Sequence, residues 1–284
     1  MAIFTNQATL SYNNTTTTSN IFTCEIIEVL SAAKNALDQE YSYGDTITYA
    51  ISIINSGTTA FNNLTITDDL GAYTVGTATV VPLTYVSGTV NYYANGILQT
   101  PPTVTNTSPL TVTGINVPAN GNVIVLYEAR VNEFAPLASA STITNTAIVS
   151  GTGLSTDITV TETITITDTA QLSITKSLSP DTVTENGQLT YTFVIQNTGN
   201  TPAVATDNAT VTDLFDPILE NITVTLNGVV LAEGPQYVYD ETTGLFQTVA
   251  GVITVPAATY VQDPVTGQWN ITPGTTILTV TGTV

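Results

Sequence analysis

Histidine is absent from the chain, and only three residues carry a positive charge. Catalysis by Ser-His-Asp or Cys-His groups and metal sites with histidine ligands are therefore excluded. The 22 acidic residues give a formal net charge of -19, so the basic patch that phosphate binding requires is missing and a nucleic-acid partner is excluded. The single cysteine, Cys24, can form no disulfide within the chain.

Long apolar runs and targeting signals are missing as well. The first residues lack the basic and apolar regions of a secretory signal peptide, and no run reaches the roughly 18 apolar residues of a membrane-spanning helix. We therefore expect no membrane insertion, and we expect neither a cofactor nor a metal. The length of 284 residues suits two domains of sandwich size.

Threonine, valine, isoleucine and tyrosine dominate the chain, a bias that suits β-strands. Strict alternation of apolar and polar residues, which indicates half-buried strands, occurs at 45–53, 64–70, 157–166, 189–195 and 276–284. Turn signals such as NSG at 55–57 and NTGN at 197–200 separate these segments at the spacing of a β-sandwich. The pattern predicts an all-β chain.

An internal repeat divides the chain. The matching segments are LSAAKNAL and LSITKSLS, ITYAISIINSG (47–57) and LTYTFVIQNTG (189–199), LTITDDL (64–70) and ATVTDLF (209–215), and GNVIVLYEARV (121–131) and GTTILTVTGTV (274–284). The first repeat continues through two more strands, for which the second has no counterpart. We predict a first sandwich over 31–170 and a second over 171–284 that lacks its final strands.

The strands that the second repeat lacks resemble the other end of the chain. Residues 3–12 resemble 143–151, and residues 20–30 resemble the strand that follows. An incomplete sandwich exposes unpaired edges. We therefore expect residues 1–30 to form a donor strand or hairpin, with a polar linker at 13–20, that completes the second sandwich of a neighbouring subunit. The predicted donor residues are Ile3, Phe4, Asn6, Ala8, Leu10 and Tyr12.

Such a contact joins the head of one subunit to the tail of the next, and a heterologous contact builds a ring or, more generally, a filament of identical subunits. In the alternative, residues 1–30 close onto the second repeat of their own chain. The protein is then a monomeric surface-adhesion or carbohydrate-binding module that uses Trp269 and the tyrosine-rich stretches at 85–93 and 237–239. An enzyme such as a carboxylate-pair glycosidase has no visible catalytic constellation.

Side chains two residues apart on a strand lie on the same face. In each repeat, three polar residues share a face with apolar neighbours in this way, so we expect them to point into the core. They are Lys34, Asp68 and Asn145 in the first repeat, and Lys176, Asp213 and, from the incoming donor strand, Asn6 in the second. Burial lowers the pKa of a lysine and raises that of a carboxyl group. A neutral amine can then attack the asparagine amide, polarised by the acid, and release ammonia.

The trio therefore predicts self-formed isopeptide bonds. We expect one within the chain, between Lys34 and Asn145 with Asp68 assisting. We expect a second between subunits, from Lys176 to Asn6 with assistance from Asp213. The alternative is a buried, hydrogen-bonded polar cluster that fixes the strand register.

The run LSITKSLSPDTVTENGQLTYTFVIQNTGN followed by ATVTDLFDP, with NTA in the preceding repeat, resembles the prokaryotic surface-repeat family known as domain of unknown function eleven. The resemblance covers most of the chain and is strongest over 172–217. It implies tandem immunoglobulin-like β-sandwiches with a structural or adhesive role at a cell or spore surface. The Lys, Asp and Asn positions also resemble the isopeptide-forming domains of Gram-positive pilins.

The sequence departs from most members of that family because it is short and shows neither a secretion signal nor a wall-sorting motif. These departures lead us to expect an extracellular fibre such as an endospore appendage, released when the mother cell lyses. An anchor or tip protein is a further expected partner.

Overall fold

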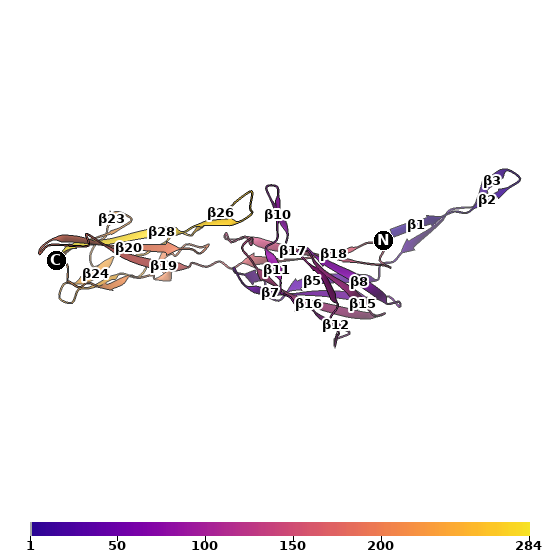
Figure 1. Cartoon of the computed structure of the whole chain (residues 1–284), viewed down its shortest axis with the longest axis horizontal. Helices are drawn as coiled ribbons and strands as arrows, with labels where there is room; N and C mark the ends of the chain where they lie inside the picture. The colour runs from indigo at the N-terminus through magenta and orange to yellow at the C-terminus, as the bar shows by residue number, and fades with distance from the viewer. Residues whose placement is uncertain (1) are drawn as a thin grey trace. The chain divides into compact units, whose positions relative to one another are not determined.

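The computed structural model describes residues 2–284, and the prediction of an all-β chain is confirmed (Figure 1). The only helical element in this range is a short 3-10 turn, η1, at Ala205–Asp207. The chain divides into two compact units. Unit 1 comprises Met1–Pro136 and Thr142–Thr165, and unit 2 comprises Leu137–Ser141 and Ile166–Val284.

Unit 1 is built from two six-stranded sheets. The first contains, in spatial order, β13 (Ile97–Gln99), β12 (Asn91–Ala94), β16 (Gly121–Val131), β7 (Thr46–Asn55) and β5 (Leu30–Ala36), with β11 (Leu83–Tyr85) also paired to β16. The second contains β14 (Thr103–Thr107), β15 (Leu110–Val117), β8 (Phe61–Asp68), β17 (Thr142–Ser150), β18 (Ile158–Ile166) and β6 (Glu40–Tyr41). A separate hairpin is formed by β9 (Tyr73–Val75) and β10 (Ala78–Val80).

The core of unit 1 follows directly from the alternation in its strands. On β7 the buried side chains are those of Ile47, Tyr49, Ile51 and Ile53. The threonine, alanine and serine residues between them are more exposed, as the two faces of a strand require. Burial of each such apolar side chain contributes roughly 1.5–3 kcal/mol.

Unit 2 has one five-stranded sheet and one three-stranded sheet. The five strands, in spatial order, are β19 (Leu172–Ser179), β20 (Gln188–Asn197), β28 (Gly274–Thr283), β22 (Glu220–Leu226) and β23 (Val229–Val230). The three-stranded sheet contains β21 (Thr212–Leu214), β25 (Leu245–Thr248) and β24 (Tyr237–Asp240), and a hairpin is formed by β26 (Thr259–Gln262) and β27 (Trp269–Thr272).

The two units repeat the same sheet in the same register. Strands β5, β7 and β16 are adjacent in unit 1, and their sequence matches β19, β20 and β28 are adjacent in unit 2. Lys34 lies opposite Ile51, and Lys176 lies opposite Phe193 at the matching position. In the part of unit 2 that the structure describes, β21 pairs only with β25, and nothing occupies the place that β17 takes beside β8.

A buried asparagine ends the central strand of each unit, at Asn55 and Asn197. Its Nδ2 donates to two loop carbonyl groups, and its Oδ1 accepts the N–H of the glycine two residues later. The carbonyl groups are those of Thr59 and Pro118 in unit 1 and of Thr201 and Pro256 in unit 2. The turn signals NSG and NTG thus carry a structural side chain that holds the loops at this end of each unit.

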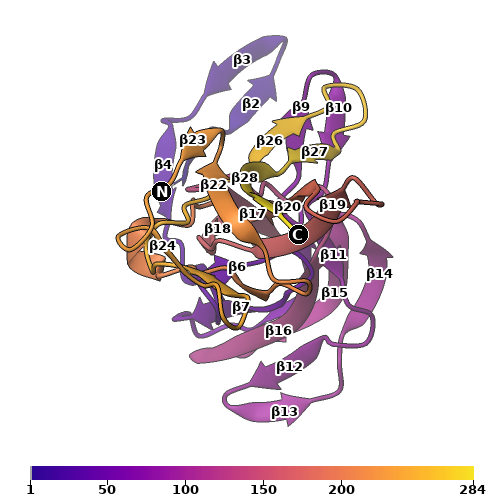
Figure 2. The ribbon, with the colours of Figure 1, turned by 90° about the vertical axis from the view of Figure 1, so that its left-hand side faces the viewer.

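The N-terminal residues form a two-stranded ribbon (Figures 1 and 2). Strand β1 (Ala2–Asn6) pairs with β4 (Phe22–Ile26), and β2 (Thr9–Tyr12) pairs with β3 (Thr15–Thr18). The polar linker expected at 13–20 is wrong, because this segment contains the turn at Asn13 and Asn14 and the return strand β3. Both asparagines have left-handed φ angles, 47° and 60°, which a tight hairpin turn requires.

Two strands have other bounds in the structure than in the sequence pattern. Strand β8 ends at Asp68 because Leu70 and Gly71 take left-handed φ angles of 56° and 74° and turn the chain. Strand β21 covers only Thr212–Leu214, and it has a strand on one side only. Strand β21 is short because no strand pairs with its second edge, and a strand keeps its extended form through its pairing partners.

Candidate functional site

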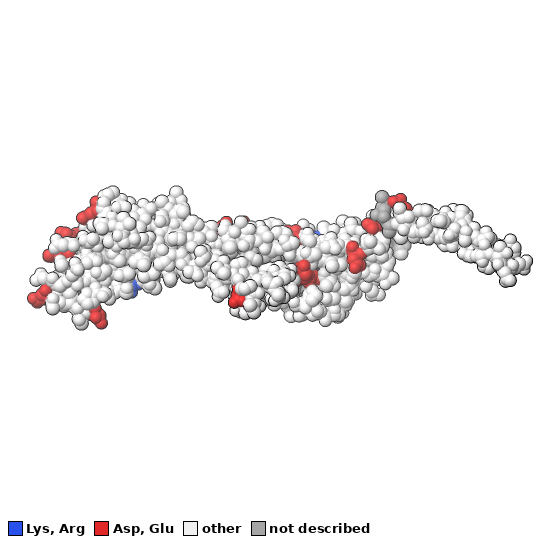
Figure 3. Space-filling view, turned by 90° about the horizontal axis from the view of Figure 1, so that it is seen from above, with Lys and Arg blue, Asp and Glu red and all other residues white. Residues whose placement is uncertain are grey.

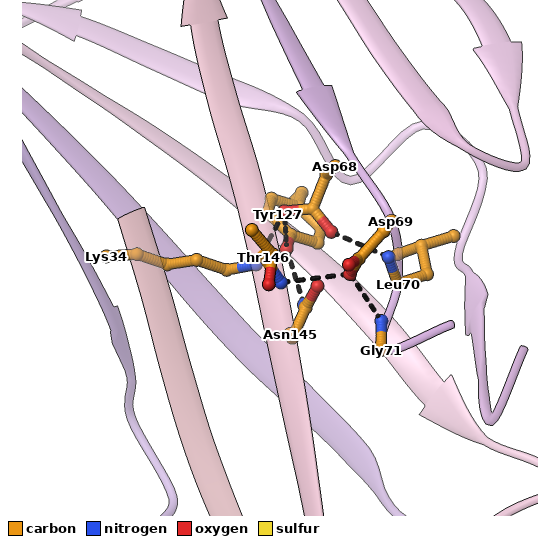
Figure 4. A network of polar contacts seen from close by, with 8 residues as sticks. All are labelled: Lys34, Asp68, Asp69, Leu70, Gly71, Tyr127, Asn145 and Thr146. Carbon is orange, nitrogen blue, oxygen red and sulfur yellow. Dashed lines mark hydrogen bonds and ion pairs between the residues drawn. The ribbon is translucent and has the colours of Figure 1, made fainter. Parts of the chain in front are cut away.

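Lys34 and Asp68 meet in the core of unit 1 (Figure 4). Lys34 extends from β5 and Asp68 ends β8, so the pair joins the two sheets. Lys34 Nζ lies 2.7 Å from Asp68 Oδ2, and both side chains have no exposed surface. An ion pair removed from water in this way is costly unless further hydrogen bonds complete it.

Tyr127 supplies one of these hydrogen bonds and joins Asn145 to the pair. Its hydroxyl donates to Asp68 Oδ2 at 2.7 Å and accepts from Asn145 Nδ2 at 3.1 Å. The sequence predicts that Asp68 polarises the Asn145 amide, and in the structure the hydroxyl of Tyr127 lies between these two side chains. Its inward phase with Val125 and Ala129 on β16 is the signal that could have identified it.

The turn after β8 holds the two acidic residues in place. Asp68 Oδ1 accepts the backbone N–H of Leu70 at 3.0 Å. Asp69 Oδ1 accepts the N–H groups of Gly71 and Thr146, each at 2.9 Å (Figure 4). Thr146 is the residue after Asn145, so this contact also fixes the strand that carries the amide.

Burial controls the electrostatics of the cluster. It lowers the pKa of Lys34, although the nearby Asp68 carboxylate acts in the opposite direction. Burial also raises the pKa of Tyr49 and of Tyr127, so both phenols remain neutral at physiological pH. A lysine with a lowered pKa is closer to the neutral, nucleophilic form.

The Asn145 amide is bound on one side only. Its Nδ2 donates to Tyr127, whereas its Oδ1 is buried without a hydrogen-bond partner. An unsatisfied buried acceptor costs about 1–3 kcal/mol. The cluster is therefore poorly completed as a purely structural hydrogen-bond network.

Unit 2 contains the matching pair, Lys176 and Asp213, in contact as an ion pair. The lysine Nζ lies 4.3 Å from the ring centroid of Tyr191 and 5.5 Å from that of Phe215. The side chains are 40% and 18% exposed, so the expectation that Lys176 is buried fails for the single chain. The exposure has a structural cause, because no strand covers the place that β17 fills in unit 1.

The predicted donor residues lie on the N-terminal hairpin, and every described side chain from residue 3 to residue 28 is exposed. Asn6 is among them, at the end of β1. The structure contains one chain, so the pairing of Asn6 with Lys176 of another copy stays a prediction.

Other classes of site find little support. Among residues 2–284 no group of three or more histidine, cysteine, aspartate or glutamate side chains is placed to hold a metal ion. Within the same range no helix has the length and apolar character that a membrane span requires. Tyr85, Tyr92 and Tyr237 are buried, so the expectation of exposed tyrosine-rich stretches is wrong for these three rings. Acidic residues form small separate spots on the face seen in Figure 3.

No protein-family model matches the chain, and no curated protein matches its sequence. Solved structures give weak matches. The major pilin subunit BcpA of Bacillus cereus, in its D312A form, is 11% identical, with 96% of this chain and 73% of that chain covered and a TM-score of 0.40. The pilus backbone protein RrgB of Streptococcus pneumoniae is 13% identical, with 86% of this chain covered and a TM-score of 0.36.

A family 123 glycoside hydrolase from Clostridium perfringens is 12% identical over 49% of this chain, with a TM-score of 0.31. The chain spans 55% of the RrgB structure and 27% of the glycoside hydrolase structure. At these identities the likeness concerns the fold alone.

Proposed function

We propose that the protein is the structural subunit of a surface filament, in which the N-terminal hairpin of one copy completes unit 2 of the next. The observation that carries the proposal is the one-sided apolar face of this hairpin. The resemblance to prokaryotic surface-repeat proteins supports an extracellular location at a cell or spore surface.

The hairpin has one apolar and one polar face. Because Phe4 pairs with Cys24 and Asn6 pairs with Phe22, these four side chains lie on the same side of the β1–β4 ribbon. The opposite side of this ribbon carries Thr5, Thr23, Glu25 and one apolar residue, Ile3. Beyond the break at 7–8, Leu10 and Tyr12 share one side of the β2–β3 pair, opposite Thr17 and Thr15. Phe4, Leu10 and Phe22 are 52%, 61% and 72% exposed, and a ribbon of two strands with such a face is unstable in water until another surface covers it.

The same alternation occurs in the strands that complete unit 1. In the β17–β18 pair, Ile143 lies opposite Ile164 and Asn145 lies opposite Glu162. The sequence match places Phe4 at the position of Ile143, and Asn6 at that of Asn145. The hairpin therefore has the pattern of the strand pair that unit 2 lacks among the described residues.

Unit 2 offers a surface that suits this hairpin. Strand β21 has a free edge, and backbone N–H and C=O groups on a free edge can pair with an added strand. Leu172, Ile174 and Leu178 of β19 share a face with Lys176 and are 42%, 53% and 42% exposed. An apolar hairpin face laid against them removes both exposed surfaces from water.

The register of unit 1 fixes the expected geometry. Ala147 lies opposite Asp68 there, and Ala8 is the match of Ala147. A donor strand in the same register places Ala8 opposite Asp213 and turns Asn6 toward Lys176. Because the contact uses different surfaces of the two copies, it repeats from one copy to the next and produces a filament wherever the rotation between copies does not close a ring.

We further propose that each sandwich is closed by an isopeptide bond. Lys34 reacts with Asn145 within the chain, and Lys176 reacts with Asn6 of the neighbouring copy, with Asp68 and Asp213 as the respective acids. The amine nitrogen replaces the amide nitrogen on the asparagine carbon, and ammonia leaves. The product contains no buried lysine charge, which relieves the cost of the ion pair.

Electron microscopy of the purified chain tests the assembly, with Phe4→Asp as the variant and Thr5→Asp as its matched control. Phe4 lies on the apolar face and Thr5 on the other, so we expect filaments from the wild type and from T5D, and none from F4D. Discrete monomers of the wild type, with the hairpin protected from protease, would show instead that the hairpin closes on its own chain. Equal assembly by both variants would contradict the assigned face.

A further inference from the structure

One continuous line of hydrogen bonds connects the lysine nitrogen of unit 1 to the amide nitrogen of Asn145. Lys34 Nζ is 2.7 Å from Asp68 Oδ2, the same oxygen is 2.7 Å from the Tyr127 hydroxyl, and that hydroxyl is 3.1 Å from Asn145 Nδ2 (Figure 4). The Nδ2 atom is the leaving group of the isopeptide reaction. Tyr127 therefore lies between the acid and the atom that has to be protonated.

Packing holds the hydroxyl at this point. Tyr127 is buried on β16, and its ring stacks on Tyr49 with centroids 5.4 Å apart and planes 19° apart. The two tyrosines are also direct partners across the strands β16 and β7. The ring has little freedom to move away, so the hydroxyl stays within reach of both Asp68 and Asn145.

We propose that Tyr127 is a catalytic proton relay in the formation of the Lys34–Asn145 bond. The inference rests on the isopeptide bond proposed above for unit 1, and it adds a residue and a path for the proton. Among the described residues no hydrogen bond joins Asp68 directly to Asn145 Nδ2, and the Tyr127 hydroxyl bonds to both.

The protons balance as follows. Lys34 passes one proton to Asp68 Oδ2, and its neutral nitrogen attacks Cγ of Asn145 while the carbonyl electrons move to Oδ1. Asp68 then gives its proton to the Tyr127 oxygen, which gives its own proton to Nδ2. Nζ loses a second proton to Asp68, the Cγ–Nδ2 bond breaks, and ammonia leaves. Tyr127 ends unchanged, and Asp68 ends protonated.

Unit 2 lacks this hydroxyl. Val280 lies opposite Tyr191 in the register that places Tyr127 opposite Tyr49. A bond in unit 2 therefore needs direct contact between Asp213 and the asparagine of the donor strand. The relay is a property of unit 1 alone, where the hydroxyl fills the space between acid and amide.

The test follows the reaction in time while the full chain is made by cell-free synthesis. Samples are quenched in acid, and the mass of the chain is measured by mass spectrometry. Monomeric wild-type protein is expected to become lighter by one ammonia, from the bond within unit 1, whereas covalent multimers lose a further ammonia for each bond between copies. Tyr127→Phe keeps the ring and loses the hydroxyl, and we expect its reaction to slow by about 100-fold or more, the scale of general acid-base catalysis. Tyr41→Phe is the control, because Tyr41 is also buried and its hydroxyl donates to a remote carbonyl, that of Pro136.

A structural role of Tyr127 is separated from the relay by measuring the unfolding of Asn145→Ala with and without Y127F, since no bond can form in that background. If Y127F lowers the stability there but reacts at the wild-type rate in the otherwise native chain, the relay is overturned and the bond stands. If the wild type loses no ammonia, both the bond and the relay are overturned. Filament formation in the microscope remains a separate result in either case.

Discussion

The two units contain the same lysine–aspartate pair in two different surroundings. In unit 1 the side chains of Lys34 and Asp68 have no exposed surface, whereas in unit 2 those of Lys176 and Asp213 are 40% and 18% exposed. The lysines have the same neighbour, because Lys34 Nζ lies 5.0 Å from the Tyr49 ring and Lys176 Nζ lies 4.3 Å from the matching Tyr191 ring. The difference lies in what covers them.

Strand β17 provides this cover in unit 1. It pairs with β8 beside Asp68 and brings Asn145 into the cluster. The comparison shows that the pair itself does not determine whether a reaction site exists. A covering strand is needed, because it removes water and supplies the amide. In the described part of unit 2 no strand covers the pair, and under the proposed assembly a strand of another copy would do so.

The largest expected effect concerns the bond between subunits. Asn6→Ala removes the amide that Lys176 attacks, so we expect N6A filaments to fall apart into monomers in boiling detergent. Wild-type filaments should give a ladder of covalent multimers on a denaturing gel. Asn145→Ala is the matched control, since it removes the amide of unit 1 and should leave the ladder intact. A ladder from N6A filaments would show that a different residue makes the bond.

The next effect compares the two lysines in a chain that does not assemble, the Phe4→Asp background. Lys34→Met removes the proposed cross-link, which would close a loop of about 100 residues and corresponds to about 4.7 kcal/mol of unfolded-state entropy. The substitution also leaves Asp68 buried without its cation. We expect the melting temperature of unit 1 to fall by roughly 10–20 °C.

In the same background Lys176→Met should shift the melting of unit 2 by only a few degrees at most, because exposed ion pairs contribute about 0–1 kcal/mol. Differential scanning calorimetry measures both transitions. Equal shifts for the two substitutions would mean that Lys34 and Lys176 contribute alike in the free subunit, and the contrast between a closed and an open site would then be wrong.

Where the two units have the same local structure, matching substitutions should lower the free energy of unfolding of each unit by similar amounts. Asn55→Ala removes three hydrogen bonds to backbone groups, and Asn197→Ala removes the three matching ones and a fourth, because Asn197 Oδ1 also accepts the N–H of Gln171. We expect each to destabilise its own unit by about 2–4 kcal/mol. Urea unfolding followed by hydrogen exchange assigns each loss to its unit, and the exposed Asn35→Ala on β5 should change the stability by less than about 0.5 kcal/mol. A loss below about 1 kcal/mol at either position would show that the asparagine does not hold its loop.

The smallest expected effect is a pH dependence. In Asn145→Ala the lysine stays unreacted, and burial lowers the pKa of Lys34 below its ordinary value of 10.5. Between this lowered pKa and 10.5 the unfolded chain binds more protons than the folded chain, so the free energy of unfolding should rise with pH in that range.

Wild-type unit 1 should lack this rise, because an amide nitrogen does not titrate. Urea unfolding of both proteins at several pH values measures the difference. A parallel pH dependence in the two proteins would indicate that the wild-type lysine is still free.

Much of this arrangement could be predicted from single residues in the sequence. The alternation in 45–53 and 189–195 predicts strands β7 and β20, and the matched positions of Lys34 and Lys176 predict the shared register. The inward phase of Asp68 and Asn145 predicts that they face the lysine. These predictions rest on a period of two, which depends only on local backbone geometry.

Other features could not be predicted from local pattern. The insertion of Tyr127 between Asp68 and Asn145 depends on the distance between two facing sheets, which no single strand determines. The exposure of Lys176 depends on which strand covers it, and the hairpin turn at Asn13 and Asn14 replaces a linker that polar composition alone had indicated.

The sequence by itself determined the all-β fold, the repeat and the faces on which the reactive residues lie, because these follow from alternation and from matched segments along one chain. Only the tertiary structure decided that the pair in unit 1 is sealed from water, that a tyrosine hydroxyl joins acid to amide, and that the pair in unit 2 stays open. Burial and hydrogen bonding across sheets are properties of packed neighbours, and residues distant in the chain become neighbours only in the folded protein.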